Sequence, residues 1–183
     1  MINGCNNNSL ANVIEEYDVS MELDRHYLIY ASNVHEDKIN DIHMISAKKN
    51  DDIIKMKVLK NLTEEDAMKY INNQKYLIDS IFTDSKVPYP GPLSNTLKCP
   101  EEFIPKTEEK EDDESFNFFY YLFANNRLTY DGCSEDILQY HAVIGLTYCK
   151  RKNSVFHIEF FTPINNTTDN YRDIVQSFRC EKS

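Results

Sequence analysis

The chain has 183 residues, with 20 basic and 30 acidic side chains and a formal net charge of −10. A chain of this length buries enough surface to fold without disulfides or a metal, and its 41% of hydrophobic residues is typical of a globular protein. The acidic balance argues against a nucleic acid or an anionic membrane as partner, because both require a basic surface. No apolar run approaches the roughly 18–20 residues of a membrane helix.

The first half begins with a polar stretch and continues with strand patterns. Residues 1–20 predict a flexible N-terminal tail, because 1–12 are polar and rich in asparagine. Residues 26–33 are aromatic and β-branched and predict a strand. Residues 42–48 and 53–59 predict a hairpin around a turn of asparagine and aspartates. In its second strand the lysines and the apolar side chains face opposite ways: Lys55 and Lys57 against Ile54, Met56 and Val58.

A helix is expected at about residues 64–82. Thr63 is a suitable N-cap, and the acidic residues that follow it suit the positive end of the helix dipole. Side chains at three- and four-residue steps form one stripe along the helix: Met68, Ile71, Lys75, Ile78 and Phe82. Residues 21–83 therefore form the first strand–helix unit.

Residues 84–115 predict a connecting segment between the two halves. Five of the six prolines lie here, and proline fits neither a helix interior nor a central strand. The window 101–114 carries eight carboxylates and two lysines, and so holds −6 of the net charge of −10. A block of like charge stays solvated, which predicts an exposed linker. The alternative is a site for calcium or for a basic partner, and a calcium loop would need a glycine that the window lacks.

The second half, 116–183, repeats the order of strands followed by a helix. Three ranges predict strands: 116–126, 136–150 and 155–163. The aromatic run in the first of them is expected to be buried on both sides. Thr168-Asp169 is expected to cap a shorter helix. These patterns predict an α+β fold of antiparallel strands with packed helices, in which the two similar hairpin–helix halves are either two small domains or two parts of one sheet.

The C-terminal third of the chain carries a resemblance to a known family. A strand at 155–161 leads through Thr168 into a helix ending at 174–178, and this pattern resembles the Mog1/PsbP-like α+β group. The first half resembles that group only loosely. The resemblance implies a non-enzymatic accessory or binding protein, since most members are of that kind, and some are exported or lipid-anchored. No catalytic residue is carried over with it.

Cys5 is a candidate for lipidation. Ile2-Asn3-Gly4-Cys5 resembles the end of a bacterial lipobox, which has an aliphatic residue three positions before the cysteine and a small residue just before it. The polar run 6–9 then resembles the tether that follows a lipidated cysteine. The alternative is a solvated cysteine in a tail. Contact with a membrane is expected only through such an anchor.

The other four cysteines are candidates for two disulfides: Cys99, Cys133, Cys149 and Cys180. Cys133 and Cys149 flank a predicted strand and could form a local bridge, in which case Cys99 would pair with Cys180. Four cysteines allow three connectivities, and the sequence leaves the choice open. In a cytosolic protein all four would instead be buried apolar residues.

The sequence predicts no catalytic residue, no cofactor and no metal. G-x-S-x-G is absent, and four glycines are too few for the usual phosphate-binding loops. The densest group of potential metal ligands includes His35, Asp37 and His43, but their spacing fits no metal motif and favours a surface loop. His141 and His157 are expected to be cross-strand partners that face solvent.

Three functional hypotheses follow from these observations. The first is an exported protein of the cell envelope or exterior, lipid-anchored through Cys5, that binds or helps assemble other proteins. The second is a cytosolic interaction or effector-like protein with free thiols. The third is a hydrolase with an unfamiliar site, near residues 35–43 or near His141 and His157. The first is favoured because it accounts for the even cysteine set, the lipobox-like Cys5 and the absence of catalytic motifs.

Overall fold

A computed structural model describes residues 9–36, 41–83, 106–125, 127–128, 138–166 and 170–181. The elements follow one another as α1 (Leu10–Glu16), β1 (Leu28–Glu36), β2 (Asp41–Lys49), β3 (Asp52–Leu59), α2 (Glu64–Thr83), β4 (Lys106–Glu111), β5 (Ser115–Asn125), β6 (Leu138–Cys149), β7 (Ser154–Pro163) and α3 (Tyr171–Gln176). Short 3-10 turns, η3 (Lys150–Lys152) and η4 (Ile164–Asn166), precede and follow β7.

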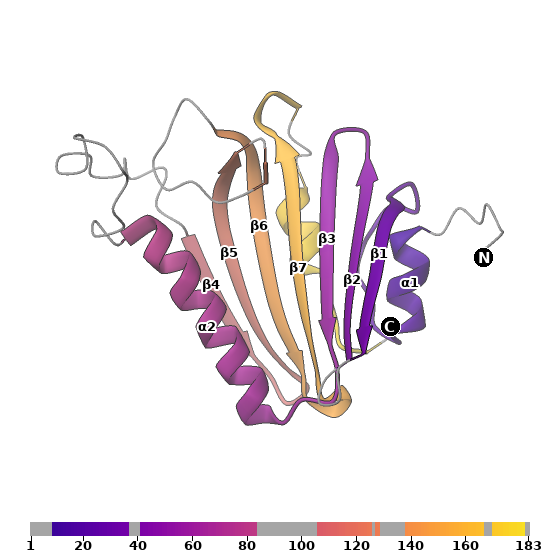
Figure 1. The fold of residues 1–183 in the computed structure, drawn as a ribbon, viewed down its shortest axis with the longest axis vertical. Helices are drawn as coiled ribbons and strands as arrows, with labels where there is room; N and C mark the ends of the chain where they lie inside the picture. The colour runs from indigo at the N-terminus through magenta and orange to yellow at the C-terminus, as the bar shows by residue number, and fades with distance from the viewer. Residues whose placement is uncertain are drawn as a thin grey trace.

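The strands form one seven-stranded antiparallel sheet in the order β1-β2-β3-β7-β6-β5-β4 (Figure 1). The predicted α+β class is therefore confirmed. The two halves of the chain meet in the middle of this sheet, where β3 pairs with β7 and Met56 lies opposite Ile158. The halves are thus two parts of one sheet.

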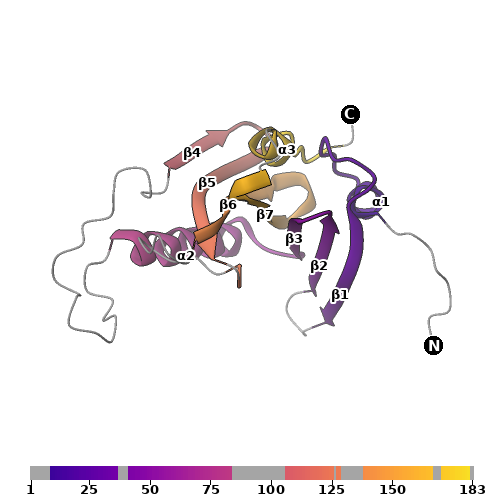
Figure 2. The ribbon, with the colours of Figure 1, turned by 90° about the horizontal axis from the view of Figure 1, so that it is seen from above.

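The two halves are similar in their strands but not in the placement of their helices. The β3–β7 ladder is symmetric about the Met56–Ile158 pair, with Ile53 opposite Phe161 and Leu59 opposite Val155. A two-fold axis through this point, normal to the sheet, would place the helices that follow β3 and β7 on the same face. Instead α2 and α3 lie on opposite faces (Figure 2).

The N-terminal tail is shorter than predicted. Residues 10–16 form α1, because Leu10, Val13 and Ile14 occupy the i, i+3 and i+4 positions of one face and are buried in the core. The side chain of Ser9 caps the helix by accepting a hydrogen bond of 3.3 Å from the backbone N–H of Asn12. The prediction of a flexible tail over 1–20 is wrong for this part, while residues 1–8 lie outside the described residues.

The acidic part of the connecting segment is also ordered. Residues 106–111 form β4, an edge strand paired with β5, and five of its six side chains are exposed. Charged side chains suit this position because they discourage pairing with another chain. The expectation of a linker across 84–115 is therefore wrong for β4, although its side chains are solvated as expected. Residues 84–105 lie outside the described residues.

The other predicted elements agree with the structure to within a few residues. The hairpin is β2–β3, with Ile54, Met56 and Val58 all buried, and the helix predicted at 64–82 is α2. The shorter C-terminal helix begins at Tyr171 with Asn170 at its N-cap. The cap predicted at Thr168-Asp169 lies outside the described residues.

Each face of the sheet carries its own hydrophobic core. One core packs the sheet against α1 and α3, and the other packs it against α2. Phe119 belongs to the first core while Phe118 and Tyr120 belong to the second, which confirms that the aromatic run of β5 is buried on both sides. On the first face α3 lies so close to β6 that a Cβ on Gly145 would come within 2.7 Å of Cγ1 of Val175.

Candidate functional site

The α2 face of the sheet is covered over only part of its width. Helix α2 packs over β5 and β6. Among the described residues, no element covers the same face of β1, β2 and most of β3, whose last residue Leu59 is buried in the core under α2 (Figure 1). We call this uncovered part the open face. Its residues include Leu28, Tyr30, Met44, Ser46, Lys48, Ile53, Lys55 and Lys57, together with His157, Glu159 and Phe161 of the adjoining strand β7, of which His157 and Phe161 are buried.

The register of the strands explains why the face divides in this way. Residues directly opposite one another in an antiparallel sheet share a face. One such row runs Met44–Lys57–His157–Leu146–Phe118, and the next runs Ser46–Lys55–Glu159–Ile144–Tyr120. Each row is apolar and buried on β5 and β6, under α2, and becomes polar on β7 and β3. The sequence itself therefore specifies a half-covered face.

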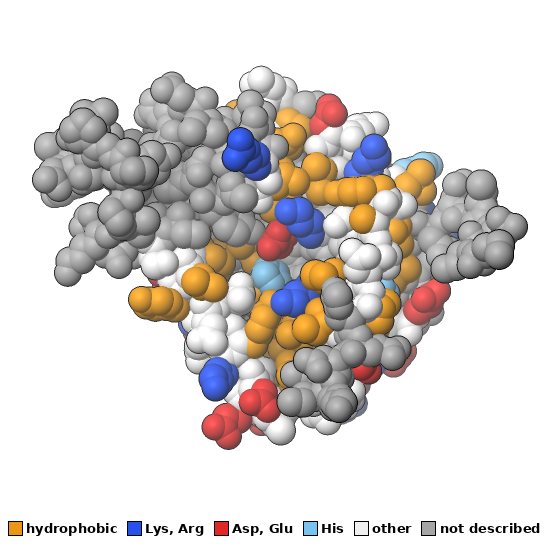
Figure 3. Space-filling model, in the orientation of Figure 1, with side chains coloured by type: hydrophobic (Ala, Val, Ile, Leu, Met, Phe, Trp, Pro, Cys, Tyr) orange, Lys and Arg blue, Asp and Glu red, His pale blue; other side chains and the backbone are white. Residues whose placement is uncertain are grey.

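Charged side chains gather at the centre of the open face, with hydrophobic side chains around them (Figure 3). Among these side chains, His157 is buried, with only 8% of its surface exposed. Its Nδ1 is 2.8 Å from the hydroxyl of Tyr70 on α2, and its Nε2 is 3.2 Å from Oε1 of Glu159. The second contact lacks hydrogen-bond geometry, so Nε2 has no hydrogen-bond partner among the described residues. Burial raises the pKa of Tyr70, and the charge of Glu159 raises it further.

Two lysines stand beside this histidine, each next to an aromatic ring. Nζ of Lys57 is 5.2 Å from the ring centroid of Tyr70, and Nζ of Lys55 is 5.0 Å from that of Phe161. Lys55 is also 4.0 Å from Oε2 of Glu159. Cation–π contacts of this kind hold an ammonium group over a ring. The open face thus carries two lysine ammonium groups that are held over aromatic rings.

The margin of the open face is apolar and exposed. Leu28, Tyr30 and Met44 are 44%, 54% and 39% exposed, and Leu77 of α2 is 52% exposed. Leu77 lies seven residues after Tyr70, and therefore on the same side of α2. Exposed apolar side chains gathered on one surface mark a protein-binding site.

A second cluster lies on the opposite face, at the β1 edge. His43 is held between two hydroxyl groups: its Nε2 is 2.9 Å from Oγ of Ser32, and its Nδ1 contacts the hydroxyl of Tyr17. Burial lowers the pKa of His43, and the positive charge of Lys60 lowers it further. A neutral imidazole can accept a proton from a serine hydroxyl, and the Ser32 hydroxyl lies within hydrogen-bond distance of His43.

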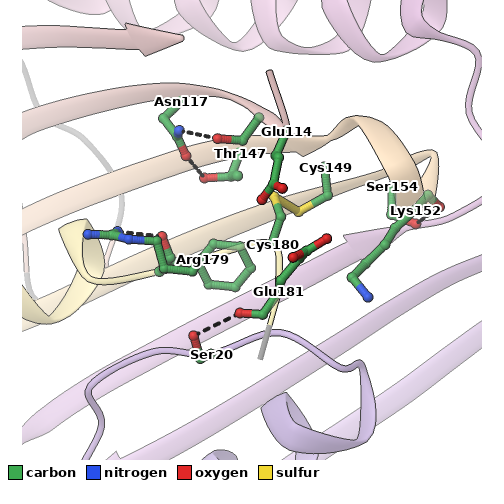
Figure 4. The surroundings of a disulfide bond; sticks show 12 residues. Ser20, Glu114, Asn117, Thr147, Cys149, Lys152, Ser154, Arg179, Cys180 and Glu181 are labelled. Carbon is green, nitrogen blue, oxygen red and sulfur yellow. Dashed lines mark hydrogen bonds between the residues drawn. A yellow bond between two sulfur atoms is a disulfide. The ribbon is translucent and has the colours of Figure 1, made fainter. Parts of the chain in front are cut away.

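The structure joins two of the four candidate cysteines in a disulfide, Cys149–Cys180 (Figure 4). The suggested local bridge between Cys133 and Cys149 is therefore wrong, and so is the pairing of Cys99 with Cys180. Cys149 ends β6, and Cys180 follows α3 where Arg179 pairs with Ser20 in an isolated β-bridge. The bond ties the C-terminal segment to the sheet, which sequence spacing alone could not indicate. Cys5, Cys99 and Cys133 lie outside the described residues.

The two histidines expected to be cross-strand partners lie on opposite faces. His141 is opposite Thr162 and its ring stacks on Tyr171 of α3, whereas His157 is opposite Leu146 and faces α2. On β6, His141 and Leu146 (the residue opposite His157) are an odd number of positions apart, so their side chains lie on opposite faces. The prediction that the two histidines are partners is therefore wrong. Burial lowers the pKa of His141, with a smaller contribution from Arg172.

The candidate metal ligands lie mainly in strands and not in a surface loop. His43 belongs to β2 and His35 to β1, while Asp37 and the side chain of His35 lie outside what the structure describes. Within the described ranges, no group of three or more His, Cys, Asp or Glu side chains could hold a metal ion. None of the described helices is long and apolar enough to span a membrane.

No family model, curated protein or solved structure matches this chain. The resemblance to the Mog1/PsbP-like group stays a prediction. The disulfide is consistent with an extracytoplasmic location, because disulfides persist in oxidising compartments. Sequence reasoning found the outward-facing Lys55 and Lys57 of the open face from their alternation. It named His157 only as a partner of His141, and did not bring it together with Glu159 and Tyr70. Only the strand register brings those three together.

Proposed function

We propose that this protein is an exported, non-enzymatic accessory protein that binds a protein partner over its open face. The observation that carries the proposal is the half-covered sheet. Both faces of β5 and β6 are buried under helices, whereas the α2 face of β1–β3 presents exposed apolar side chains and lysines. A partner that packed there would bury them as α2 buries the rest of the face.

The location belongs to the same proposal. The Cys149–Cys180 disulfide supports an oxidising compartment. A lipid on Cys5 would hold the protein at a membrane surface of the envelope, where an accessory protein would meet its partners. Disulfide formation and lipidation are independent features, so the binding function does not depend on the anchor.

Site-specific photo-cross-linking in the native host tests the proposal. A benzophenone amino acid replaces Met44, an exposed residue of the open face, or Lys106, exposed on the edge strand β4. We expect one discrete protein adduct from position 44 and none from position 106. Equal adducts from both positions, or none from position 44, would contradict the proposal.

A hydrolase is the second candidate function, and the Ser32–His43 hydrogen bond is the observation that favours it. His43 would take the hydroxyl proton of Ser32 as the serine attacked a carbonyl carbon, and would return it to the leaving group. A fluorophosphonate probe separates the candidates. Labelling of Ser32 that disappears in His43→Ala supports the hydrolase, and an unlabelled Ser32 removes it.

A further inference from the structure

The open face has the opposite charge to the protein as a whole. The chain carries a net charge of −10. On the open face, three lysines stand against one carboxylate: Lys48, Lys55 and Lys57 against Glu159. A basic surface on an acidic protein is a local feature that selects for an acidic partner.

The lysines have the spacing of side chains on an extended chain. Lys55 and Lys57 are alternate residues of β3, and alternate residues of a strand lie roughly 7 Å apart on one face. An extended segment has the same spacing between its own alternate side chains. Two carboxylates at positions i and i+2 of such a segment could therefore each meet one lysine.

Aromatic rings hold Lys55 and Lys57 in place, and Lys55 also lies 4.0 Å from Oε2 of Glu159. The rings of Tyr70 and Phe161 support Lys57 and Lys55, so ordering their side chains on binding costs less entropy. Among the described residues, no carboxylate pairs with Lys48 or Lys57. Glu159 lies between His157 and Lys55, whose positive charge offsets it.

Apolar side chains next to the lysines set a second requirement for a segment that binds the open face. Met44 lies directly opposite Lys57, and Tyr30 contributes an exposed ring at 6.0 Å from Nζ of Lys48. A segment with carboxylates alone would leave these side chains in water, whereas apolar residues between the carboxylates would cover them. Nucleic acid also carries regularly spaced anions, but the net charge of −10 would repel a long polyanion.

We infer that the open face recognises an extended acidic segment of the partner protein, with carboxylates at alternate positions and apolar side chains between them. This inference depends on the proposed function, because it names the chemistry of the partner that the open face binds. It assigns Lys55 and Lys57 as the residues that determine specificity.

Two synthetic peptides test the inference against the full chain by amide NMR. Both have twelve residues with the same leucines and phenylalanines, and they differ only in carrying either glutamate or lysine at the alternate positions. We expect the acidic peptide to shift the amide signals of β2, β3 and β7. The basic peptide should leave them unchanged, and added salt should weaken the acidic complex.

Charge-reversal variants provide the matched control. Lys55→Glu with Lys57→Glu should weaken binding of the acidic peptide by about tenfold or more. Lys69→Glu with Lys106→Glu makes the same change in net charge at exposed positions outside the open face, and should change the affinity less than about twofold. Equal loss in both double variants would overturn the inference, since it would show a response to net charge alone.

The remaining outcomes separate this inference from the proposed function. If both peptides shift the open face equally, the surface binds proteins through its apolar side chains and the acidic specificity is wrong. If neither peptide shifts it while position 44 still cross-links to a partner, the partner binds without an acidic segment and the inference alone is overturned. Failure of both experiments overturns both.

Discussion

Phe156→Ala is expected to lower the free energy of unfolding by about 3–5 kcal/mol, the usual cost of removing a buried phenylalanine. Phe156 lies on β7, is 1% exposed, and packs between Tyr17, just after α1, and Phe178, just after α3. Its centroid is 5.9 Å from that of Tyr17 and 5.0 Å from that of Phe178. The cavity would therefore loosen the packing at both ends of one core. Equilibrium urea denaturation measures the loss.

Tyr76→Ala is the matched control for this substitution. Tyr76 lies on α2 and is 71% exposed, so truncating it removes an aromatic ring of similar size without opening a cavity. Its free energy of unfolding should change by less than about 0.5 kcal/mol. A cost of less than 1 kcal/mol for Phe156→Ala, or equal costs for the two variants, would show that the core is not packed as described.

Removing the Cys149–Cys180 disulfide should destabilise the protein by about 3–4 kcal/mol. The two residues are 31 positions apart. Closing a loop of that length lowers the conformational entropy of the unfolded chain, and this raises the free energy of unfolding by about 3–4 kcal/mol. For a protein of this size the melting temperature should fall by roughly 6–16 °C. The double variant Cys149→Ala/Cys180→Ala, followed by thermal unfolding, measures the effect without leaving a lone thiol.

The same double variant, with and without a reducing agent, isolates this bond from the other cysteines. If reduction destabilises the wild type as much as the double substitution does, and leaves the variant unchanged, the loss belongs to Cys149–Cys180. A double variant as stable as the wild type would contradict the stabilising role. Separation of the C-terminal segment would then have to be opposed by other contacts, such as the Ser20–Arg179 bridge.

Local pattern predicted most of the elements, because their signals lie within a few residues. The alternation in β3 and the three- and four-residue stripe of α2 each follow from one face being buried. α1 was missed because its apolar residues, Leu10, Val13 and Ile14, make a stripe less than two turns long within a polar stretch. β4 was missed because its charges suit a solvated linker as well as an edge strand.

The candidate site could not be predicted from local sequence patterns, because it depends on pairing between strands that are distant in the sequence. Lys57 meets His157 only through the β3–β7 ladder, and Tyr70 reaches the same histidine from α2. The Cys149–Cys180 pairing likewise depends on where the chain after α3 returns to the sheet. A shift of one residue in register would turn Lys57 to the other face, so no property of these residues alone predicts their meeting.

A non-reducing peptide map of the protein from its own host, alkylated during lysis, tests most directly that this is an exported, disulfide-bonded protein. We expect a linked pair of peptides containing Cys149 and Cys180, with Cys5 N-terminal and acylated if the lipid anchor exists. With Cys5 acylated, a second bridge within the chain would join Cys99 to Cys133. Cys149 and Cys180 recovered as free, alkylated thiols would contradict the account and favour a cytosolic protein instead.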